Sequence, residues 1–148
     1  MTLAPPYYAD AERVAAQWIK TYVAGIDPTK VATTLPEQQL EFIQVRALPT
    51  SSPDVDINAK HHSFLTLDFW AASSTSKPQW GTASQLAMRT RAAMGEAQPF
   101  GQAVDLGAGF LPIRVQAVYP ATEPRRIDGD PGGYARYTFD AFFDWVQG

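Results

Sequence analysis

Apolar and polar residues alternate with a period of two along four stretches of the chain, which is the pattern of strands with one buried face. The stretches are Glu41–Leu48, Ser63–Ala72, Ile113–Tyr119 and Tyr134–Trp145. In the last one, every second residue from Ala135 to Trp145 is apolar, so it predicts a long antiparallel strand buried on one side.

Two other stretches have the spacing of amphipathic helices. Val14, Trp18 and Tyr22 fall four residues apart, and Asp10 precedes them as a suitable N-cap. The segment Trp80–Met94 places its larger apolar residues on one side and is followed by a glycine. These signals predict one helix of about four turns near the start of the chain and a second in the middle.

The resulting order predicts a single α+β domain over residues 1–148, in the order α-β-β-α-β-β. Its expected fold is an antiparallel sheet of about four strands with two main helices packed on it. Val31–Leu35 and Ala103–Leu106 are compatible with further short strands, whereas Thr122–Gly133 is rich in turn-forming residues and is interpreted as a connection.

Composition narrows the possible functions. The chain has 148 residues, 45% of them hydrophobic, and a net charge of −3 without any basic cluster. This balance argues against a nucleic-acid footprint or a polybasic membrane-binding segment. Cysteine is absent, which excludes disulfides, thiol catalysis and cysteine-based metal sites. The N-terminus lacks the features of a signal peptide, so we expect a soluble domain that is not secreted.

Candidate catalytic or metal-binding residues are few. His61 and His62 are the only histidines, and adjacent residues on a strand point to opposite faces, so they cannot easily share a metal. The segment from Asp128 to Gly133 begins like a calcium loop but lacks the later acidic ligands, and it is better interpreted as a turn. We therefore predict no catalytic residue, metal site or cofactor.

Aromatic residues are more numerous than one face of a small sheet needs. The chain has 4 Trp, 6 Tyr and 8 Phe. Phe64 and Trp70 share a strand face with Thr66 and Asp68, and Phe142 likewise lies on a polar face. Either helices cover both sides of the sheet, or these aromatics belong to a protein–protein interface; the sequence leaves both explanations open.

The order of elements resembles that of the tail terminator proteins of long-tailed (siphovirus-type) bacteriophages. The similarity lies in the Ala-rich helix Asp10–Ala24, the strands Glu41–Arg46 and Phe64–Ala71, the helix Ser84–Met94 and the closing strand Gly133–Phe143. It covers most of the chain and rests on size, element order and the character of two strands.

This resemblance implies a structural virion protein without catalytic residues. Tail terminators form a hexameric ring on the end of the tail tube, stop its polymerisation and present the surface for joining the head. The implied partners are other copies of the chain, the tail tube protein and a head completion or connector protein, with DNA passing through the lumen unbound and no membrane involved. The implied location is the head–tail junction of the virion, and the host cytoplasm during assembly.

Two polar segments are the candidate partner contacts under this reading, Pro49–Lys60 and Thr122–Gly133, since loops on a rigid scaffold often carry function. Their charged residues are the candidate interface residues: Asp54, Asp56, Arg125, Arg126, Asp128 and Asp130. Replacing Arg125 and Arg126 with Ala is expected to leave the fold intact and to weaken assembly.

Other functions fit the sequence less well. A head-side connector or stopper (head completion) protein has similar size and composition. A small-molecule-binding α+β domain would need polar groups that converge in an apolar cavity. A binder of single-stranded nucleic acid would need a basic groove, and the chain offers one basic doublet, Arg125-Arg126.

Overall fold

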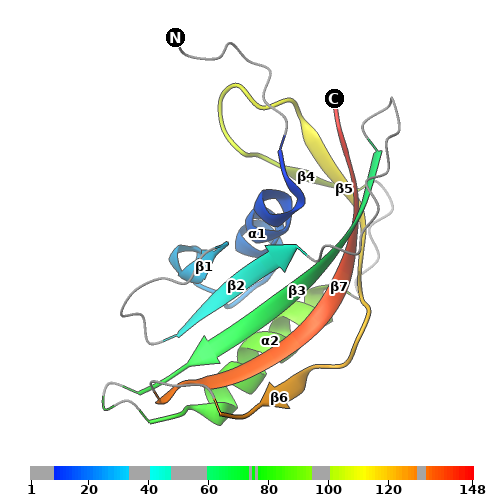
Figure 1. Ribbon diagram of the computed structural model, residues 1–148. Coiled ribbons are helices and arrows are strands. Elements are labelled where there is room, and N and C mark those ends of the chain that lie inside the picture. Colours follow the sequence, from blue (N-terminus) through cyan, green and yellow to red (C-terminus); the bar gives the residue numbers. More distant parts are fainter. Residues whose placement is uncertain are drawn as a thin grey trace.

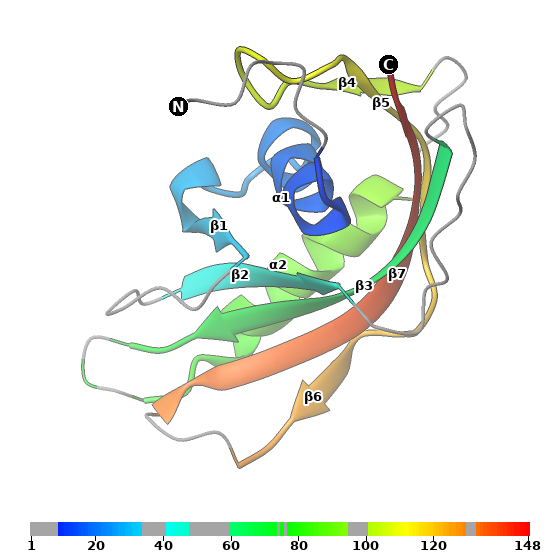
Figure 2. The same cartoon turned by 45° about the horizontal axis from the view of Figure 1, so that its top comes forward.

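The structure is a computed structural model and describes residues 9–33, 41–47, 60–73, 75, 77–94, 101–129 and 133–148. Within these residues, seven strands form one strongly curled sheet, and two helices lie on the inner side of the curl (Figure 1). The view in Figure 2 shows the longest strands bending around the helices.

The elements follow one another as α1 (Ala11–Tyr22), a 3₁₀ turn (Pro28–Lys30), β1 (Val31–Ala32), β2 (Glu41–Ala47), β3 (Lys60–Ala71), α2 (Trp80–Met94), β4 (Gln102–Val104), β5 (Ile113–Pro120), β6 (Arg125–Ile127) and β7 (Ala135–Gln147). The strand order across the sheet is β1-β2-β3-β7-β5-β4, and β6 pairs with β7 as well. The β1–β2 pair is parallel, whereas the other pairs are antiparallel.

The predicted four-stranded antiparallel sheet in the order α-β-β-α-β-β is therefore wrong. The sheet is mixed and has three additional strands, β1, β4 and β6. Each of them has only two or three residues. That length is too short for an alternating pattern to be recognised, and backbone pairing with a longer neighbour defines each of these strands.

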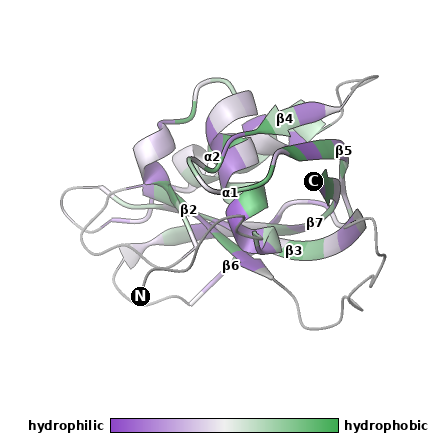
Figure 3. Cartoon of the chain, turned by 90° about the horizontal axis from the view of Figure 1, so that it is seen from above, coloured by the Kyte–Doolittle hydropathy of each residue, from purple (hydrophilic) through white to green (hydrophobic). Residues whose placement is uncertain are grey.

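The long strand β7 organises the sheet. One of its edges pairs with β3 continuously from Ala135–Ala71 to Val146–Lys60. Its other edge is shared, because β5 pairs with the C-terminal half of β7 and β6 pairs with the N-terminal part. Apolar residues at alternate positions face the helices, and Figure 3 shows hydrophilic and hydrophobic residues alternating along the strands.

Both helices pack on the same face of the sheet. In α1, the Asp10 side chain accepts a hydrogen bond from the backbone N–H of Arg13 at 2.9 Å, as the N-cap prediction requires. Trp18 meets the edge of Phe143 with ring centroids 5.5 Å apart. In α2, Ala83 is buried with Ala71 and Ala135 of the sheet, and these small side chains allow helix and sheet to approach closely.

Candidate interaction face

The face of the sheet opposite α1 and α2 is not covered by any described helix. We call it the open face, and it consists of Phe42, Gln44, Arg46, His62, Phe64, Thr66, Asp68, Trp70, Tyr119, Arg125, Arg136, Thr138, Asp140, Phe142 and Asp144. Its side chains alternate with those of the core, as the pleat of each strand requires. Of the two explanations for the surplus aromatics, helices on both faces therefore do not apply to the described part of the chain.

One end of the open face is an aromatic cluster centred on Phe142. The Phe142 ring stacks on Phe64 of β3 and on His62, with centroids 4.7 and 4.8 Å apart. Tyr119 of β5 lies against the same ring at 5.3 Å, and 40% of Tyr119 is exposed. Asp144 contacts Nδ1 of His62 through one carboxylate oxygen. We call these five residues the aromatic end.

The middle of the open face is charged and tightly paired. The Asp68 carboxylate accepts a hydrogen bond from Nε of Arg46 at 2.7 Å and lies 3.6 Å from Nη1 of Arg136. Asp140 accepts a 2.7 Å hydrogen bond from the Thr66 hydroxyl. The partners sit on adjacent strands, opposite or diagonal to each other, so they stabilise the register of β2, β3 and β7.

The other end of the open face is again aromatic. Phe42 and Trp70 stack with centroids 5.7 Å apart, and Tyr134 meets the edges of both rings. The guanidinium of Arg136 lies over the Trp70 ring at 4.9 Å. Phe42 is almost fully buried here although no described helix covers it, because its aromatic neighbours and the sheet exclude water.

The surroundings of Tyr119 in the aromatic end raise the pKa of its phenol. Burial raises the pKa of the Tyr119 phenol above its usual value of 10.0, and the nearby negative charge of Asp144 raises the pKa further. Both causes favour the protonated phenol, which can donate a hydrogen bond and does not repel an acidic group.

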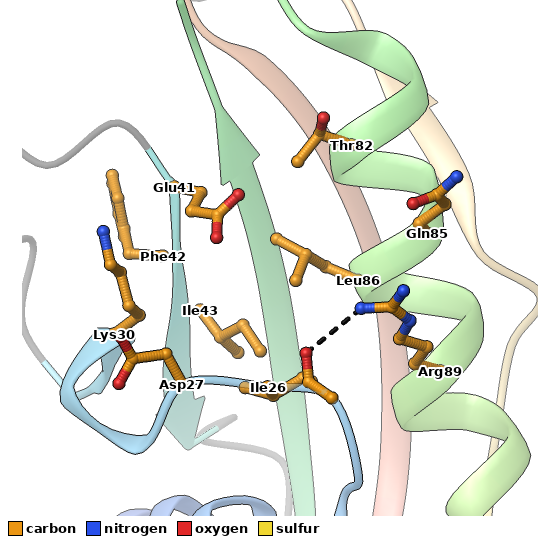
Figure 4. Close-up of a pocket in the computed structure, with 11 residues that line it drawn as sticks. Ile26, Asp27, Lys30, Glu41, Phe42, Ile43, Thr82, Gln85, Leu86 and Arg89 are labelled. Atoms are coloured by element: carbon orange, nitrogen blue, oxygen red, sulfur yellow. Dashed lines mark hydrogen bonds between the residues drawn. The ribbon is translucent and has the colours of Figure 1, made fainter.

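A small hollow lies on the other side of the sheet, between α2 and the start of β2 (Figure 4). Its volume is about 130 Å³, and Nη1 of Arg89 donates a hydrogen bond to the backbone oxygen of Gly25 at its edge, at 3.1 Å. Ligand pockets usually have roughly 300–1,000 Å³ and an apolar lining, whereas charged residues of both signs, Asp27, Lys30, Glu41 and Arg89, line this hollow. Two wider depressions, of about 380 and 320 Å³, lie beside α1 and along residues 103–113.

In residues 9–33, 41–47, 60–73, 75, 77–94, 101–129 and 133–148, no three His, Asp or Glu side chains are close enough to hold a metal ion. No described helix has the length and apolar character needed to span a membrane. The polar groups of the open face are largely engaged with one another across the strands, which fixes the shape of the face.

No protein-family model and no curated protein sequence matches the chain. The fold is nevertheless similar to a solved one. A chain in the virion of a native gene transfer agent (GTA) particle superposes with a TM-score of 0.50 and 15% sequence identity, over 95% of this chain and 87% of the other. The chain thus shares its fold with a chain of the gene transfer agent virion.

Among the predicted interface residues, the two arginines lie on opposite sides of the sheet. Arg125 lies on the open face, where it is 4.0 Å from Asp140, while Arg126 points to the helix side and lies 3.7 Å over the ring of Trp80. Asp128 accepts a 2.8 Å hydrogen bond from Arg126. The arginine doublet therefore does not form one basic patch, because neighbouring residues of a strand face opposite sides. Asp54, Asp56 and Asp130 lie outside the described residues.

The two histidines also separate, as the alternation predicts. His61 stacks on Trp145 on the core face, with centroids 3.9 Å apart, and His62 belongs to the aromatic end. The sequence pattern did not single out Tyr119, and it drew attention to His62 only as a candidate metal ligand. The available signal was the presence of Phe64 and Phe142 on nominally polar strand faces, but nothing in the sequence indicated which strands would be neighbours.

Proposed function

We propose that the chain is a structural protein of a phage-like virion and acts as a tail terminator. In this role it forms a closed ring on the end of the tail tube, stops tube polymerisation and provides the surface that joins the head. It acts through binding, without catalysis or a cofactor, and its partners are other copies of the chain, the tube protein and a head completion protein.

The observation that carries the proposal is the shared fold. Similarity to a chain in a gene transfer agent virion extends over 95% of this chain, so it involves the whole domain and not a common local motif. The tail-terminator role is a finer assignment. It is supported by the segments on which the resemblance to tail terminators rests, since they form α1, β2, β3, α2 and β7.

The open face supports a binding role. Monomeric proteins rarely leave clustered aromatic side chains on a sheet face in contact with water, and aromatic residues are enriched at protein interfaces. His62, Tyr119 and Asp144 remain partly accessible at the aromatic end, with the His62 side chain 49% exposed. A ring of identical subunits requires each chain to offer two different surfaces, and the sheet has two chemically distinct sides.

The experiment compares the purified chain alone and mixed with tail tubes. Light scattering gives the mass in solution, and electron micrographs show where the chain binds. A ring of about six copies of the 16.3 kDa chain has a mass of about 98 kDa. We expect such a ring, free or as a cap on one end of each tube, and we expect added protein to halt the lengthening of tubes.

The head-side connector is the competing assignment, and the same samples test it. Isolated heads are added in place of tubes. Binding to heads with no effect on tube ends or tube length would assign the chain to the head side and contradict the terminator role. A chain that ignores both would contradict a place at the head–tail junction altogether.

A further inference from the structure

We propose that copies of the chain meet head to tail. The side of α2 that faces away from the sheet and carries Met88, here called the outer side of α2, lies in one copy against the aromatic end of the open face in the next. This interface rests on the proposed ring and specifies which surfaces build it. The occupant of each surface is therefore a second copy of the chain.

The first argument is exposure. Of the described residues, Met88 and Tyr119 are the two large hydrophobic residues that are strongly exposed, at 48% and 40%. Met88 lies on the outer side of α2, and Tyr119 lies at the aromatic end. Removing apolar surface from water is energetically favourable, and contact between the two patches removes both of them from water in one interface.

The second argument is placement. Because α2 packs on the inner face of the sheet and Tyr119 lies on the opposite face, the two patches of one chain cannot touch each other (Figure 1). A two-fold dimer would need both patches within one self-complementary interface, and their positions on opposite sides of the sheet do not allow that. Repeated contact between different surfaces is heterologous, and it closes into a ring when the rotation between copies allows closure.

Shape is also suitable around Met88. Two of its four nearest neighbours on the helix surface, Ser84 and Ala92, have small side chains, and the other two are Gln85 and Arg91. An exposed methionine can approach flat aromatic rings closely on the side of the small residues, and thioether–aromatic contacts are favourable. The stacked rings of Phe142, Phe64 and Tyr119 offer such a surface.

The outer side of α2 and the aromatic end carry opposite charges. The helix α2 carries Arg89 and Arg91 and no acidic residue. Arg91 pairs with Glu123 at 2.9 Å, and Arg89 donates a hydrogen bond to the backbone oxygen of Gly25 at 3.1 Å while forming no ion pair with a carboxylate of the described residues. The aromatic end carries Asp144, whose side chain is 33% exposed. Docking α2 on the aromatic end brings Arg89 of one copy toward Asp144 of the next, which favours this pairing over contact between like surfaces.

Cross-linking tests the interface directly, because the chain has no cysteine of its own. We would prepare Met88→Cys and Tyr119→Cys as separate variants, mix them with tail tubes and treat the mixture with a short bismaleimide. The matched control is Thr29→Cys, an exposed position on the 3₁₀ turn, mixed with Tyr119→Cys. Circular dichroism and thermal unfolding confirm that each variant is folded.

We expect the Met88→Cys and Tyr119→Cys pair to give cross-linked heterodimer in yield on the order of tenfold above the control pair, because docking raises the effective concentration of the two thiols. A yield equal to the control would overturn the proposed interface.

A charge exchange gives a second readout. Arg89→Glu and Asp144→Arg should each reduce ring formation, and a chain carrying both changes should recover it, since every interface then regains a pair of opposite charges. The absence of recovery, with both folds intact, contradicts the Arg89–Asp144 contact.

The outcomes separate this interface from the proposed function. If the unmodified chain caps tubes but the cross-linking yield equals that of the control, the head-to-tail interface is wrong and the terminator role stands. If the unmodified chain neither forms a ring nor caps tubes, both proposals fail.

Discussion

The carboxylate of Asp68 on β3 accepts a hydrogen bond from Nε of Arg46 on β2, at 2.7 Å. The Asp68 side chain is 1% exposed, whereas that of Arg46 is 47% exposed. The ion pair therefore joins a buried anion to a cation that remains in water, and Arg136 approaches the same carboxylate from the other side. This arrangement places a charge inside a sheet face that no described helix covers, and it ties together three adjacent strands.

Replacing Asp68 with Asn should destabilise the fold. The amide is nearly the same size but loses the charge, so the hydrogen bond from Arg46 and the attraction of Arg136 weaken. We expect the free energy of unfolding to fall by about 1.5–3 kcal/mol, the usual range for a hydrogen bond to a charged group. Urea denaturation with an unchanged m value measures the effect.

The companion to this prediction is Arg46→Ala. It removes the donor of the same hydrogen bond and leaves the buried Asp68 carboxylate with Arg136 alone, so the free energy of unfolding should again fall by about 1.5–3 kcal/mol. An Asp68→Asn variant as stable as the unmodified protein would contradict the structural role assigned to the buried carboxylate.

The long elements of this fold could be predicted from sequence because each contains enough residues to display its period. The segment Trp80–Met94 was predicted with the bounds that α2 has, and the alternating stretch from residue 134 to 145 lies within one residue of β7 at its N-terminal end. Of the short strands, β1 and β4 lie at the stretches that were compatible with strands, Val31–Leu35 and Ala103–Leu106, whereas β6 could not be predicted. Its three residues are mostly exposed and are defined only by backbone pairing with β7.

Tyr119 makes the stability sensitive to alkaline pH. Since its pKa is raised in the folded chain, the folded state binds more protons than the unfolded state between the ordinary pKa of about 10 and the raised value. The stabilisation is complete below pH of about 10 and is lost as pH rises through the folded-state pKa.

Ultraviolet titration of the phenols, compared between the unmodified chain and Tyr119→Phe, isolates this group. Asp144→Asn should lower the pKa of Tyr119 only part of the way, because burial is the larger cause and remains. A normal pKa for Tyr119 would contradict the packing described for the aromatic end.

Arg126 should stabilise the fold through its contacts with other residues of the same chain. Its guanidinium lies 3.7 Å over the Trp80 ring and donates to Asp128, so it holds β6 against α2. Arg126→Ala is expected to lower the free energy of unfolding by about 0.5–1 kcal/mol, the range for an exposed cation–π contact. Hydrogen exchange of the β6 amides should become faster in this variant.

Arg126→Lys is the matched control, since it keeps the positive charge and loses the planar stacking group. Equal exchange rates in the unmodified chain and in Arg126→Ala would contradict the anchoring role.

The Arg126→Ala result also matters for the predicted effect of the double Ala variant on assembly, because both Arg125 and Arg126 contact other residues of their own chain. Weakened assembly in the double Ala variant would therefore count as an interface effect only if its fold were as stable as before.

The candidate site was harder to predict than the fold for a specific physical reason. The alternation placed Phe64 and Phe142 on polar faces, but the aromatic end exists because β3, β5 and β7 are adjacent and in a particular register. Register depends on long-range pairing, which one sequence does not encode as a local pattern. The sequence pointed instead to charged residues in two polar segments as interface candidates. Of these, Arg125 and Arg126 lie on opposite sides of the sheet.

The core contains one polar pair whose removal should be costly. The indole N–H of Trp145 donates to the hydroxyl of Ser63 at 3.1 Å, and both residues are buried. Ser63→Ala leaves the indole N–H without its acceptor in a site closed to water, so the free energy of unfolding should fall by about 1–3 kcal/mol. In a Trp145→Phe background the same Ser63→Ala change should cost much less, because no donor remains to be satisfied. Urea unfolding of the four proteins completes this double-mutant cycle, and an equal cost in the two backgrounds would show that the hydrogen bond contributes nothing.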